Sequence, residues 1–378
     1  MNNKKRILVL SSLANSLINF RGDFIKNLVK NGYDVYAAAP GFTTENHKKV
    51  QNLGAIPVKF NLQRTGLNPF KDFKTILELK KIMANNKIDL VFPYTVKPVI
   101  YGSIAANINK IPVISLITGL GFAFSGLTFK ARMLQRLNEF LYKISIRKNK
   151  TIVFQNSDDH QLFLDRKIIS KNQKVGFVSG SGVNLEWFKT RVNENTSDVI
   201  SFVIVTRLIK EKGVHLYIEA AKKLKEKYPK AEFHVIGASG NSPSSIKSEI
   251  LYNLHEKGTI VFHGSQSNVS EHLFKRDIFV LPTYYREGVP RSILEALSVG
   301  MPVITTNTPG CKETVINGKN GFLIKPQDLN ELVSVMEYFL VNKEKIKEMG
   351  INSRIYAEER FDVNIINNSL LNILNNVF

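Results

Sequence analysis

Residues 278–306 read IFVLPTYYREGVPRSILEALSVGMPVITT, which is a short apolar run, a polar loop, an amphipathic segment and a second apolar run. Short apolar runs bounded by turn residues are typical of buried parallel strands, and the segment between these two has the length of a helix. Pro290 suits the first turn of that helix, because proline has no amide proton to lose there. Strand, helix and strand in succession form the unit of a doubly wound parallel sheet, so the stretch predicts an α/β fold.

The same alternation extends along the rest of the chain. We expect further strands at residues 6–12, 33–39, 89–92, 113–116, 151–155, 174–178, 199–205, 232–236, 259–262, 302–305 and 321–324. Between them we expect helices at residues 20–31, 73–85, 100–108, 130–148 and 213–227. A loop at residues 11–20 follows the first strand.

The length of 378 residues exceeds what one hydrophobic core supports, so two α/β domains are expected. The turn-rich residues 179–195 provide the linker. We place the N-terminal domain at residues 1–185, the C-terminal domain at 186–360, and a C-terminal helix that returns to the N-terminal domain at 361–378. Ligands of such folds bind at the carboxyl edges of the strands, which would line a cleft between the domains.

The composition excludes several classes of protein. Hydrophobic residues make up 43% of the chain and charged residues 22%, as in an ordinary globular protein. Cys311 is the single cysteine, which fits a reducing cytoplasm. Residues 111–129 carry no charge and are long enough to span a membrane, but their glycines and Pro112 favour a buried strand and a loop. Neither G-x-G-x-x-G nor a P-loop motif occurs, so a dehydrogenase or an ATPase is not expected.

The positive charge is concentrated in one half of the sequence. Residues 1–185 hold 28 Lys and Arg against 10 Asp and Glu, a net charge of +18, whereas the remainder has a net charge of +2. Such a surplus indicates an anionic partner: nucleic acid, anionic lipid or a phosphorylated acceptor. Residues 126–150 combine seven basic side chains with phenylalanines, as in a helix that lies on anionic lipid, although a solvated helix beside a core loop is the alternative.

Two glutamates flank the start of the helix in residues 278–306. Glu287 lies in the preceding loop and Glu295 about a turn and a half into the helix, so both could face one ligand. A carboxylate accepts hydrogen bonds from vicinal hydroxyls, Gly288 allows close approach to the backbone, and a helix start attracts phosphate. The spacing alone is weak, because Glu295 could equally lie on a solvated face.

Residues 206–213, TRLIKEKG, place Arg207 and Lys212 between a strand and a helix start. A cation is unfavourable at a helix N-terminus unless an anion lies between them. An arginine fork and a lysine point charge together suit a diphosphate. Surface exposure of two unrelated cations is the alternative.

Residues 287–324, EGVPRSILEALSVGMPVITTNTPGCKETVINGKNGFLI, resemble the nucleotide-sugar site of family 4 retaining glycosyltransferases, which have the GT-B fold. FQNSDD, GSGVNLEWF and VTRLIKEKGV follow the order found in that family. The resemblance implies that Glu287 contacts the donor sugar, Glu295 the ribose, and Arg207 and Lys212 the diphosphate, neutralising the departing nucleotide. It further implies donor contacts from Gly288, Val289, Pro290 and Arg291, with Gln266, Thr283 and His263 near the base.

The resemblance is weaker in the N-terminal half. The family often has a glycine pair after the first strand and a histidine in this half of the cleft, and the matching loops here contain neither. For the acceptor we expect contacts from Asn15, Ser16, Lys97, Thr118, Gly119, Arg132 and Arg136. No Asp-x-Asp motif accompanies the nucleotide site, so we expect no metal; Arg207, Lys212 and the helix dipole would replace one. No nucleophile is evident, and the resemblance implies same-face substitution assisted by the leaving phosphate.

The branch that this chain resembles builds capsule, O-antigen and lipid-linked glycan precursors. It implies transfer of an N-acetylhexosamine from UDP to a polyprenyl-diphosphate-linked sugar, with no other cofactor, by a cytoplasmic protein at the inner face of the plasma membrane. A transferase with a soluble acceptor is one alternative, and a UDP-sugar 2-epimerase is another, although the histidines it would need are missing. A nucleic-acid-binding protein would explain the charge but neither Glu287 nor Glu295, so no nucleic-acid partner is expected.

Overall fold

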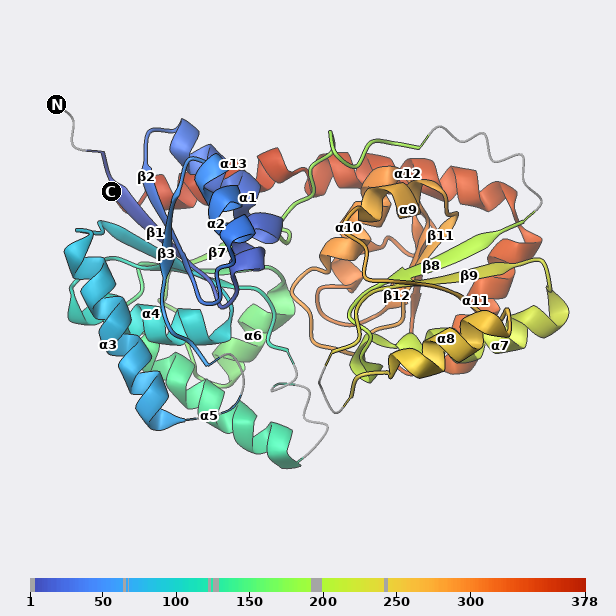
Figure 1. The fold of residues 1–378 in the computed structure, drawn as a ribbon, viewed down its shortest axis with the longest axis horizontal. Coiled ribbons are helices and arrows are strands. Elements are labelled where there is room, and N and C mark those ends of the chain that lie inside the picture. Colours follow the sequence, from blue (N-terminus) through green and yellow to red (C-terminus); the bar gives the residue numbers. More distant parts are fainter. Residues whose placement is uncertain are drawn as a thin grey trace. The chain divides into compact units, whose positions relative to one another are not determined.

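The computed structural model describes residues 4–63, 66, 68–121, 124, 129–191, 199–240 and 244–378. The chain forms two compact units (Figure 1). Unit 1 contains Met1–Ser181 together with Asn364–Phe378, and unit 2 contains Gly182–Val363. Each unit has a parallel sheet with its own hydrophobic core, which confirms the predicted α/β class.

The first sheet of unit 1 has four parallel strands in the order β3-β2-β1-β4. A second parallel sheet has the order β5-β6-β7. Bridges between Val91 and Val113 and between Tyr94 and Leu116 join β4 to the start and end of β5. The strands are β1 (Arg6–Leu10), β2 (Asp34–Ala39), β3 (Ile56–Lys59), β4 (Leu90–Pro93), β5 (Ile114–Ile117), β6 (Thr151–Phe154) and β7 (Val175–Phe177).

The helices of unit 1 bury their apolar faces against this sheet. Thr43, Asn68 and Asn156 cap three of them by accepting a hydrogen bond from a backbone amide of the first turn. Ile366, Leu370 and Leu374 bring the last helix into the same core as the first. The helices are α1 (Ala14–Lys30), α2 (Thr44–Asn52), α3 (Pro69–Asn85), α4 (Val96–Ile108), α5 (Phe129–Ser145), α6 (Ser157–Asp165) and α13 (Val363–Asn375).

The sheet of unit 2 has six parallel strands in the order β10-β9-β8-β11-β12-β13. They are β8 (Ser201–Val205), β9 (Glu232–Ile236), β10 (Val261–Gly264), β11 (Ile278–Leu281), β12 (Val303–Thr306) and β13 (Gly321–Ile324). The helices are α7 (Val214–Lys227), α8 (Ser248–Glu256), α9 (Val269–Phe274), α10 (Arg291–Val299), α11 (Leu329–Val341) and α12 (Glu344–Arg360), with short 3₁₀ turns η2 (Lys210–Lys212) and η3 (Lys312–Thr314). This strand order is that of a dinucleotide-binding fold.

Several predicted elements need correction. The loop expected at residues 11–20 is wrong, because α1 already begins at Ala14 and buries Ala14 and Leu17. The chain after β4 is likewise helical from Val96, and Pro290 precedes α10 instead of lying in its first turn. The helix expected at residues 130–148 ends at Ser145. Elements α2, β3 and α6 were not predicted, since their short, polar or exposed sequences carry little hydrophobic periodicity.

The uncharged residues 111–129 contain the buried strand β5. Their aromatic loop falls largely outside the described residues. Within the described part of the chain, no helix has both the length and the apolar character needed to cross a membrane.

Candidate active site

Strands β8 and β11 are neighbours in the sheet of unit 2, and the chain proceeds from them in opposite directions. Such a topological switch point opens a crevice beyond the carboxyl ends of the two strands, where ligands of this fold bind. The chain leaving β8 supplies Arg207 and Lys212, and the chain leaving β11 supplies Tyr285 and Glu287. Three of the residues singled out by sequence, Arg207, Lys212 and Glu287, therefore converge on the switch point.

An ion pair joins the two segments. The Lys212 ammonium binds Oε1 of Glu287, and only 10% and 13% of these side chains are exposed. The Tyr285 ring lies beneath both cations, with its centroid 5.5 Å from the Arg207 guanidinium carbon and 5.3 Å from the Lys212 ammonium. The aromatic face attracts both cations and holds them near each other. Tyr285 was not predicted, since only the folded loop shows which ring faces the cations.

The backbone of η2 is fixed against the end of β11. Gly213 has φ +75°, and a Cβ there would lie 2.1 Å from the Pro282 carbonyl oxygen, so only glycine permits this approach. The buried Thr283 hydroxyl donates to the Glu211 carbonyl at 3.1 Å and accepts from the Tyr285 amide at 3.1 Å. These bonds occupy the Thr283 hydroxyl, which positions the loop that carries Tyr285.

A second glycine fixes the loop of Glu287. Gly310 has φ +82°, and a Cβ there would lie 1.5 Å from the Gly288 carbonyl oxygen and 3.0 Å from that of Glu287. The segment after β12 therefore packs directly on the backbone that leads into α10. Val289 and Pro290 are buried in the same turn. The resemblance assigned donor contacts to this turn, and the structure places it beside the Lys212–Glu287 pair.

Glu295 forms an ion pair within α10. Its Oε1 lies 2.9 Å from Nε of Arg291, and 14% of the Glu295 side chain is exposed. Burial raises the pKa of Glu295, and the charge of Arg291 partly opposes that shift. Arg291 was predicted to contact the donor through its backbone amide, and its side chain pairs with the glutamate predicted to bind ribose. The solvated face considered for Glu295 is not found.

Two other reactive groups near the switch point are held neutral. Burial, and then the charge of Glu287, raises the pKa of the Cys311 thiol to about 12, so this cysteine is not a thiolate nucleophile. His215 lies in the first turn of α7 with its ring edge toward Tyr284, at a centroid distance of 6.2 Å. Burial, and then the charge of Lys210, lowers the pKa of His215.

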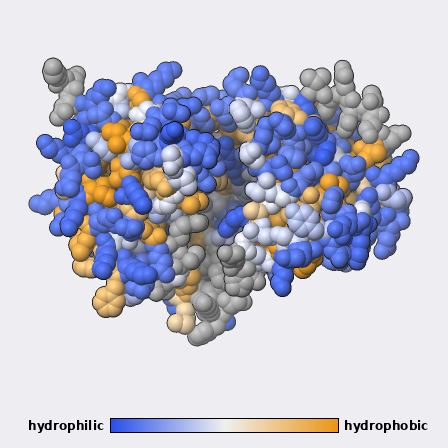
Figure 2. Space-filling view, in the orientation of Figure 1, coloured by the Kyte–Doolittle hydropathy of each residue, from blue (hydrophilic) through white to orange (hydrophobic). Residues whose placement is uncertain are grey.

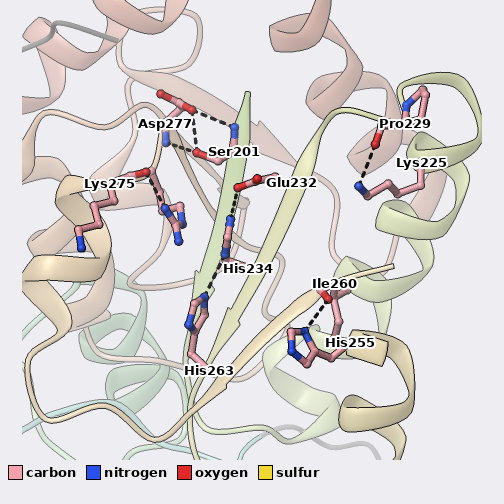
Figure 3. Close-up of polar contacts among 11 residues, drawn as sticks. Ser201, Lys225, Pro229, Glu232, His234, His255, Ile260, His263, Lys275 and Asp277 are labelled. Carbon is pink, nitrogen blue, oxygen red and sulfur yellow. Dashed lines mark hydrogen bonds and ion pairs between the residues drawn. The ribbon is translucent and has the colours of Figure 1, made fainter. Parts of the chain in front are cut away.

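A row of polar side chains crosses β9 and β10 toward the same edge of the sheet (Figure 3). Nε2 of His234 lies 2.9 Å from Oε2 of Glu232, and Nδ1 lies 3.0 Å from Nε2 of His263. Burial lowers the pKa of both histidines to about 4. Because a carboxylate only accepts, neutral His234 donates from Nε2 and accepts at Nδ1 from His263. This arrangement leaves Nδ1 of His263 as an acceptor, while Gln266 donates to the His263 carbonyl at 2.6 Å.

Unit 1 has a switch point of its own between β1 and β4. Here hydroxyls meet: Tyr94 donates to Ser16 at 3.1 Å and Thr95 to Ser12 at 3.1 Å. Thr95 has φ +67°, an uncommon conformation for a β-branched residue. Arg21 is buried behind the Tyr94 ring, 5.5 Å from its centroid. Of these residues only Ser16 was predicted.

The other residues predicted for the acceptor occupy three places in unit 1. Asn15 is exposed in the first turn of α1, next to Ser16. Lys97, in the first turn of α4, donates to the Gln63 carbonyl at 2.8 Å and to Oδ1 of Asp72 at 3.1 Å. The remaining ones lie after β5 or on the exposed side of α5: Thr118, Gly119, Arg132 and Arg136.

Family profiles match both halves of the chain. The family profile described as glycosyl transferases group 1 matches residues 186–356, and that described as glycosyl transferase 4-like matches residues 6–156. The chain belongs to this glycosyltransferase family. The match confirms the resemblance seen in the sequence and identifies an enzyme, so the 2-epimerase and nucleic-acid-binding alternatives are no longer needed.

Relatives of this glycosyltransferase cover most or nearly all of its length. A Campylobacter jejuni protein named N,N'-diacetylbacillosaminyl-diphospho-undecaprenol alpha-1,3-N-acetylgalactosaminyltransferase is 28% identical over 98% of this chain and 99% of its own. An Escherichia coli protein named UDP-Gal:alpha-D-GlcNAc-diphosphoundecaprenol alpha-1,3-galactosyltransferase is 26% identical over 70% of each chain. The structure of Anabaena HepE in complex with UDP matches with a TM-score of 0.78 and 17% identity, over 99% of this chain and 100% of that one, and so shares the fold.

Proposed function

We propose that this glycosyltransferase moves an N-acetylhexosamine from UDP onto a polyprenyl-diphosphate-linked sugar, with retention of configuration and without a metal. The observation that carries the proposal is the Lys212–Glu287 pair at the switch point of unit 2, with Arg207 beside it on the Tyr285 ring. The site then contains two cations for a diphosphate and a carboxylate for sugar hydroxyls, within one pair of loops.

The donor would bind along the carboxyl edge of the sheet in unit 2. Arg207 and Lys212 take the diphosphate, and Glu287, still held by Lys212, accepts from a hydroxyl of the sugar. Glu295 accepts from the ribose, oriented by Arg291 at 2.9 Å. At the far end, the acceptor Nδ1 of neutral His263 complements the N3–H donor of uracil, whereas adenine and cytosine present an acceptor at the corresponding ring nitrogen.

The chemistry follows from these positions. The bond between the anomeric carbon and the β-phosphate oxygen breaks, and the acceptor oxygen attacks the same face. The acceptor hydroxyl proton passes to the departing phosphate oxygen, so UDP leaves as the acceptor is glycosylated. Arg207 and Lys212 stabilise the charge that develops on this phosphate, the role that a metal ion serves in other transferases. No protein nucleophile is required, in keeping with the protonated state of Cys311.

The acceptor is proposed from chemistry and from the names of relatives. Both the Campylobacter jejuni and the Escherichia coli relatives are named for diphospho-undecaprenol-linked acceptors. The surplus of +18 in residues 1–185 favours an anionic substrate presented at an anionic surface. The hydroxyls of Ser12, Ser16 and Thr95 suit the terminal sugar, and the exposed Arg132 and Arg136 suit the diphosphate. We accordingly propose peripheral action at the cytoplasmic face of the plasma membrane.

Product analysis tests this proposal. The full chain is incubated with UDP-linked GlcNAc, GalNAc, glucose and galactose, and with prenyl-diphosphate-linked mono- and disaccharides. We expect transfer from an N-acetylhexosamine donor, an α linkage by NMR, and the same rate in EDTA. Absence of both transfer and donor hydrolysis with every UDP sugar would refute the enzyme assignment. Equal rates with the free reducing sugar as acceptor would instead support the soluble-acceptor alternative.

A further inference from the structure

The outward face of α3 is unusually apolar for a surface helix. Phe70 is 83% exposed, Phe73 60% and Leu77 39%, and their spacing places them along one side of the helix. The opposite side buries Thr75, Leu79 and Met83 in the core of unit 1. The helix therefore has one face for its own core and a second apolar stripe that this core does not use.

Lysines accompany this stripe. Lys71, Lys74, Lys80 and Lys81 are all exposed. The acidic residues of α3 are engaged elsewhere: Asp72 pairs with Lys97 at 3.1 Å, and Glu78 accepts from the Asn61 amide at 3.0 Å. The four lysines outnumber these two carboxylates, so the outward face of α3 combines apolar side chains with a surplus of positive charge. We call this face the α3 stripe and define it by Phe70, Phe73, Leu77, Lys74 and Lys81.

A similar surface occurs on a second helix of the same layer. Helix α4 packs against both α3 and α5. On α5, Met133 is 61% exposed, Phe140 59% and Ile144 50%, and basic side chains lie between them. Figure 2 shows hydrophobic side chains among hydrophilic ones over the part of unit 1 that contains α3. The apolar and basic pattern thus recurs on two helices that share a neighbour.

We propose that the α3 stripe is a membrane-anchoring face whose partner is an anionic lipid bilayer. This proposal rests on the proposed function in one respect: the lipid-linked acceptor gives the protein a reason to bind a membrane. An interfacial helix buries aromatic and aliphatic side chains in the boundary between headgroups and acyl chains, and its lysines reach the lipid phosphates. The charge on the stripe selects the partner, because the lysines that flank the apolar residues outnumber the carboxylates of α3.

The stripe favours lipid over nucleic acid or a protein groove. Nucleic acid would use the lysines but would gain little from Leu77, which has no aromatic face on which a base could stack. A protein groove would bind the apolar residues but would not by itself require Lys74 and Lys81 beside them. The α3 stripe would add a second contact to the α5 surface, and two weak contacts bind a bilayer far more tightly than one.

Vesicle binding by the full chain tests the proposal. Partition is measured by co-sedimentation with phosphatidylcholine vesicles and with vesicles that contain about 30% phosphatidylglycerol, since anionic lipid is the proposed partner. We expect binding to the anionic vesicles, and at least a tenfold lower partition coefficient for Phe70→Ser/Phe73→Ser. The matched control is Ile351→Ser/Ile355→Ser, which removes two exposed apolar residues, 52% and 45% exposed, from α12 of unit 2. The control should bind as the native chain does.

A charge-matched pair separates the stripe from net charge. Lys74→Glu/Lys81→Glu and Lys223→Glu/Lys347→Glu change the net charge by the same amount, but only the first pair lies on α3. We expect the first to reduce binding to anionic vesicles severalfold more than the second. Equal loss in both, or unchanged binding of the Phe70→Ser/Phe73→Ser variant, would overturn the proposal. So would a native dimer in sedimentation velocity that this variant converts to monomer, since a second copy would then cover the stripe.

Transfer to a short, water-soluble prenyl-diphosphate acceptor keeps the two proposals apart. The Phe70→Ser/Phe73→Ser variant should retain native turnover with this acceptor, which also demonstrates correct folding, while losing activity on the vesicle-bound acceptor. If the native chain binds vesicles through α3 yet transfers no sugar to any acceptor, the proposed function fails and the membrane face stands. If transfer occurs without vesicle binding, the reverse holds.

Discussion

The two switch points of this glycosyltransferase have the same topology but opposite chemistry. In unit 2 the crevice contains Arg207, Lys212 and Glu287, with Lys212 and Glu287 paired and largely buried. In unit 1 the corresponding place contains the hydroxyls of Ser12, Ser16, Tyr94 and Thr95. One sheet edge is built for charge, and the other for neutral hydrogen bonding.

The net charge of the two halves is the reverse of the charge at their switch points. Residues 1–185 carry +18 and the remainder only +2. In unit 1 many of the cations lie on the outer faces of helices such as α3 and α5. The near-neutral half therefore gathers an ion pair and a further cation at its switch point, whereas the basic half carries much of its surplus on the outer faces of helices. The net charge of a domain indicates the charge of the partner that it binds. The ion pairs within a site indicate the chemistry of that site.

The largest effect should come from breaking the charged site. Lys212→Ala removes the proposed diphosphate contact and the ammonium that pairs with Glu287. We expect kcat/KM for the donor to fall by about 10²–10³, as for loss of one preorganised group that stabilises developing charge. The free energy of unfolding should fall by roughly 2–3 kcal/mol, because a mostly buried carboxylate loses its partner. Donor kinetics, UDP calorimetry and urea unfolding measure these effects.

Lys227→Ala is the matched control for this experiment. Lys227 also pairs with a glutamate of unit 2, Glu337, but 67% of its side chain is exposed. Such a surface pair is screened by solvent and contributes little to stability, and turnover should be unchanged. If Lys212→Ala behaved like Lys227→Ala, the pair at the switch point would have no part in donor use.

The next effect concerns the backbone that holds the charged site. Gly310→Ala would place a Cβ 1.5 Å from the Gly288 oxygen, so the Glu287 loop must move. We expect a loss of about 3 kcal/mol or more in the free energy of unfolding, as for a steric conflict in a packed interior, together with weaker UDP binding. Gly318→Ala is the control, since Gly318 has a similar φ of +76° but no atom within 4 Å of the new Cβ.

The control should lose only about 1 kcal/mol, the cost of an alanine in the left-handed region, and should bind UDP normally. Equal losses in both variants would show that the φ angle alone matters. In that case the contact between Gly310 and Gly288 would not be what holds the loop of Glu287.

Acidification should distinguish the two units. Burial lowers the pKa of His234 to about 4 in the folded state, whereas it is near 6.5 in the unfolded state. Between these two pH values the unfolded state binds a proton that the folded state does not. Stability is therefore complete above pH 6.5 and falls as the pH drops toward 4. We expect unit 2 to lose roughly 2–3 kcal/mol from this buried side chain at pH 4.

Hydrogen exchange followed by mass spectrometry at several pH values resolves the two units. Peptides from β9 and β10 should lose protection before those from β1 and β2, and His234→Gln should reduce the difference. Simultaneous loss in both units would show that the histidines of unit 2 do not govern its acid stability.

Much of the charged site could be predicted from sequence, because the family resemblance assigned roles to matched positions and apolar runs located the strands beside them. Apolar runs fixed β9 and β13 at the residues where the structure has them. Apolar runs do not give the order of strands in a sheet, so the prediction that Arg207, Lys212 and Glu287 share one site came from the resemblance. The pairing of β8 with β11 is what brings their segments together. The pairing of Lys212 with Glu287 was not predicted, since strand ends give proximity but not side-chain geometry.

Features that depend on tertiary packing could not be predicted from the sequence. His234 and His263 are 29 residues apart, and only the register of β9 against β10 brings them to 3.0 Å. Phe70 and Phe73 are of a residue type that is usually buried, and only the packing of α3 shows that they are exposed. The start of α1 was missed because its first residues, Ala14 to Ser16, are small or polar and resemble a loop.

The smallest effect should come from the neutral site. Ser16→Ala removes the hydroxyl that accepts from Tyr94 at 3.1 Å and that we propose faces the acceptor sugar. A neutral hydrogen bond contributes about 0.5–1.5 kcal/mol, so KM for the acceptor should rise about 3- to 10-fold while KM for the donor is unchanged. Ser369→Ala is the control: its hydroxyl donates to the Ile365 carbonyl on α13 of the same unit, away from the switch point. A change in donor KM, or equal effects of both substitutions on the acceptor, would contradict the division between a charged donor site and a neutral acceptor site.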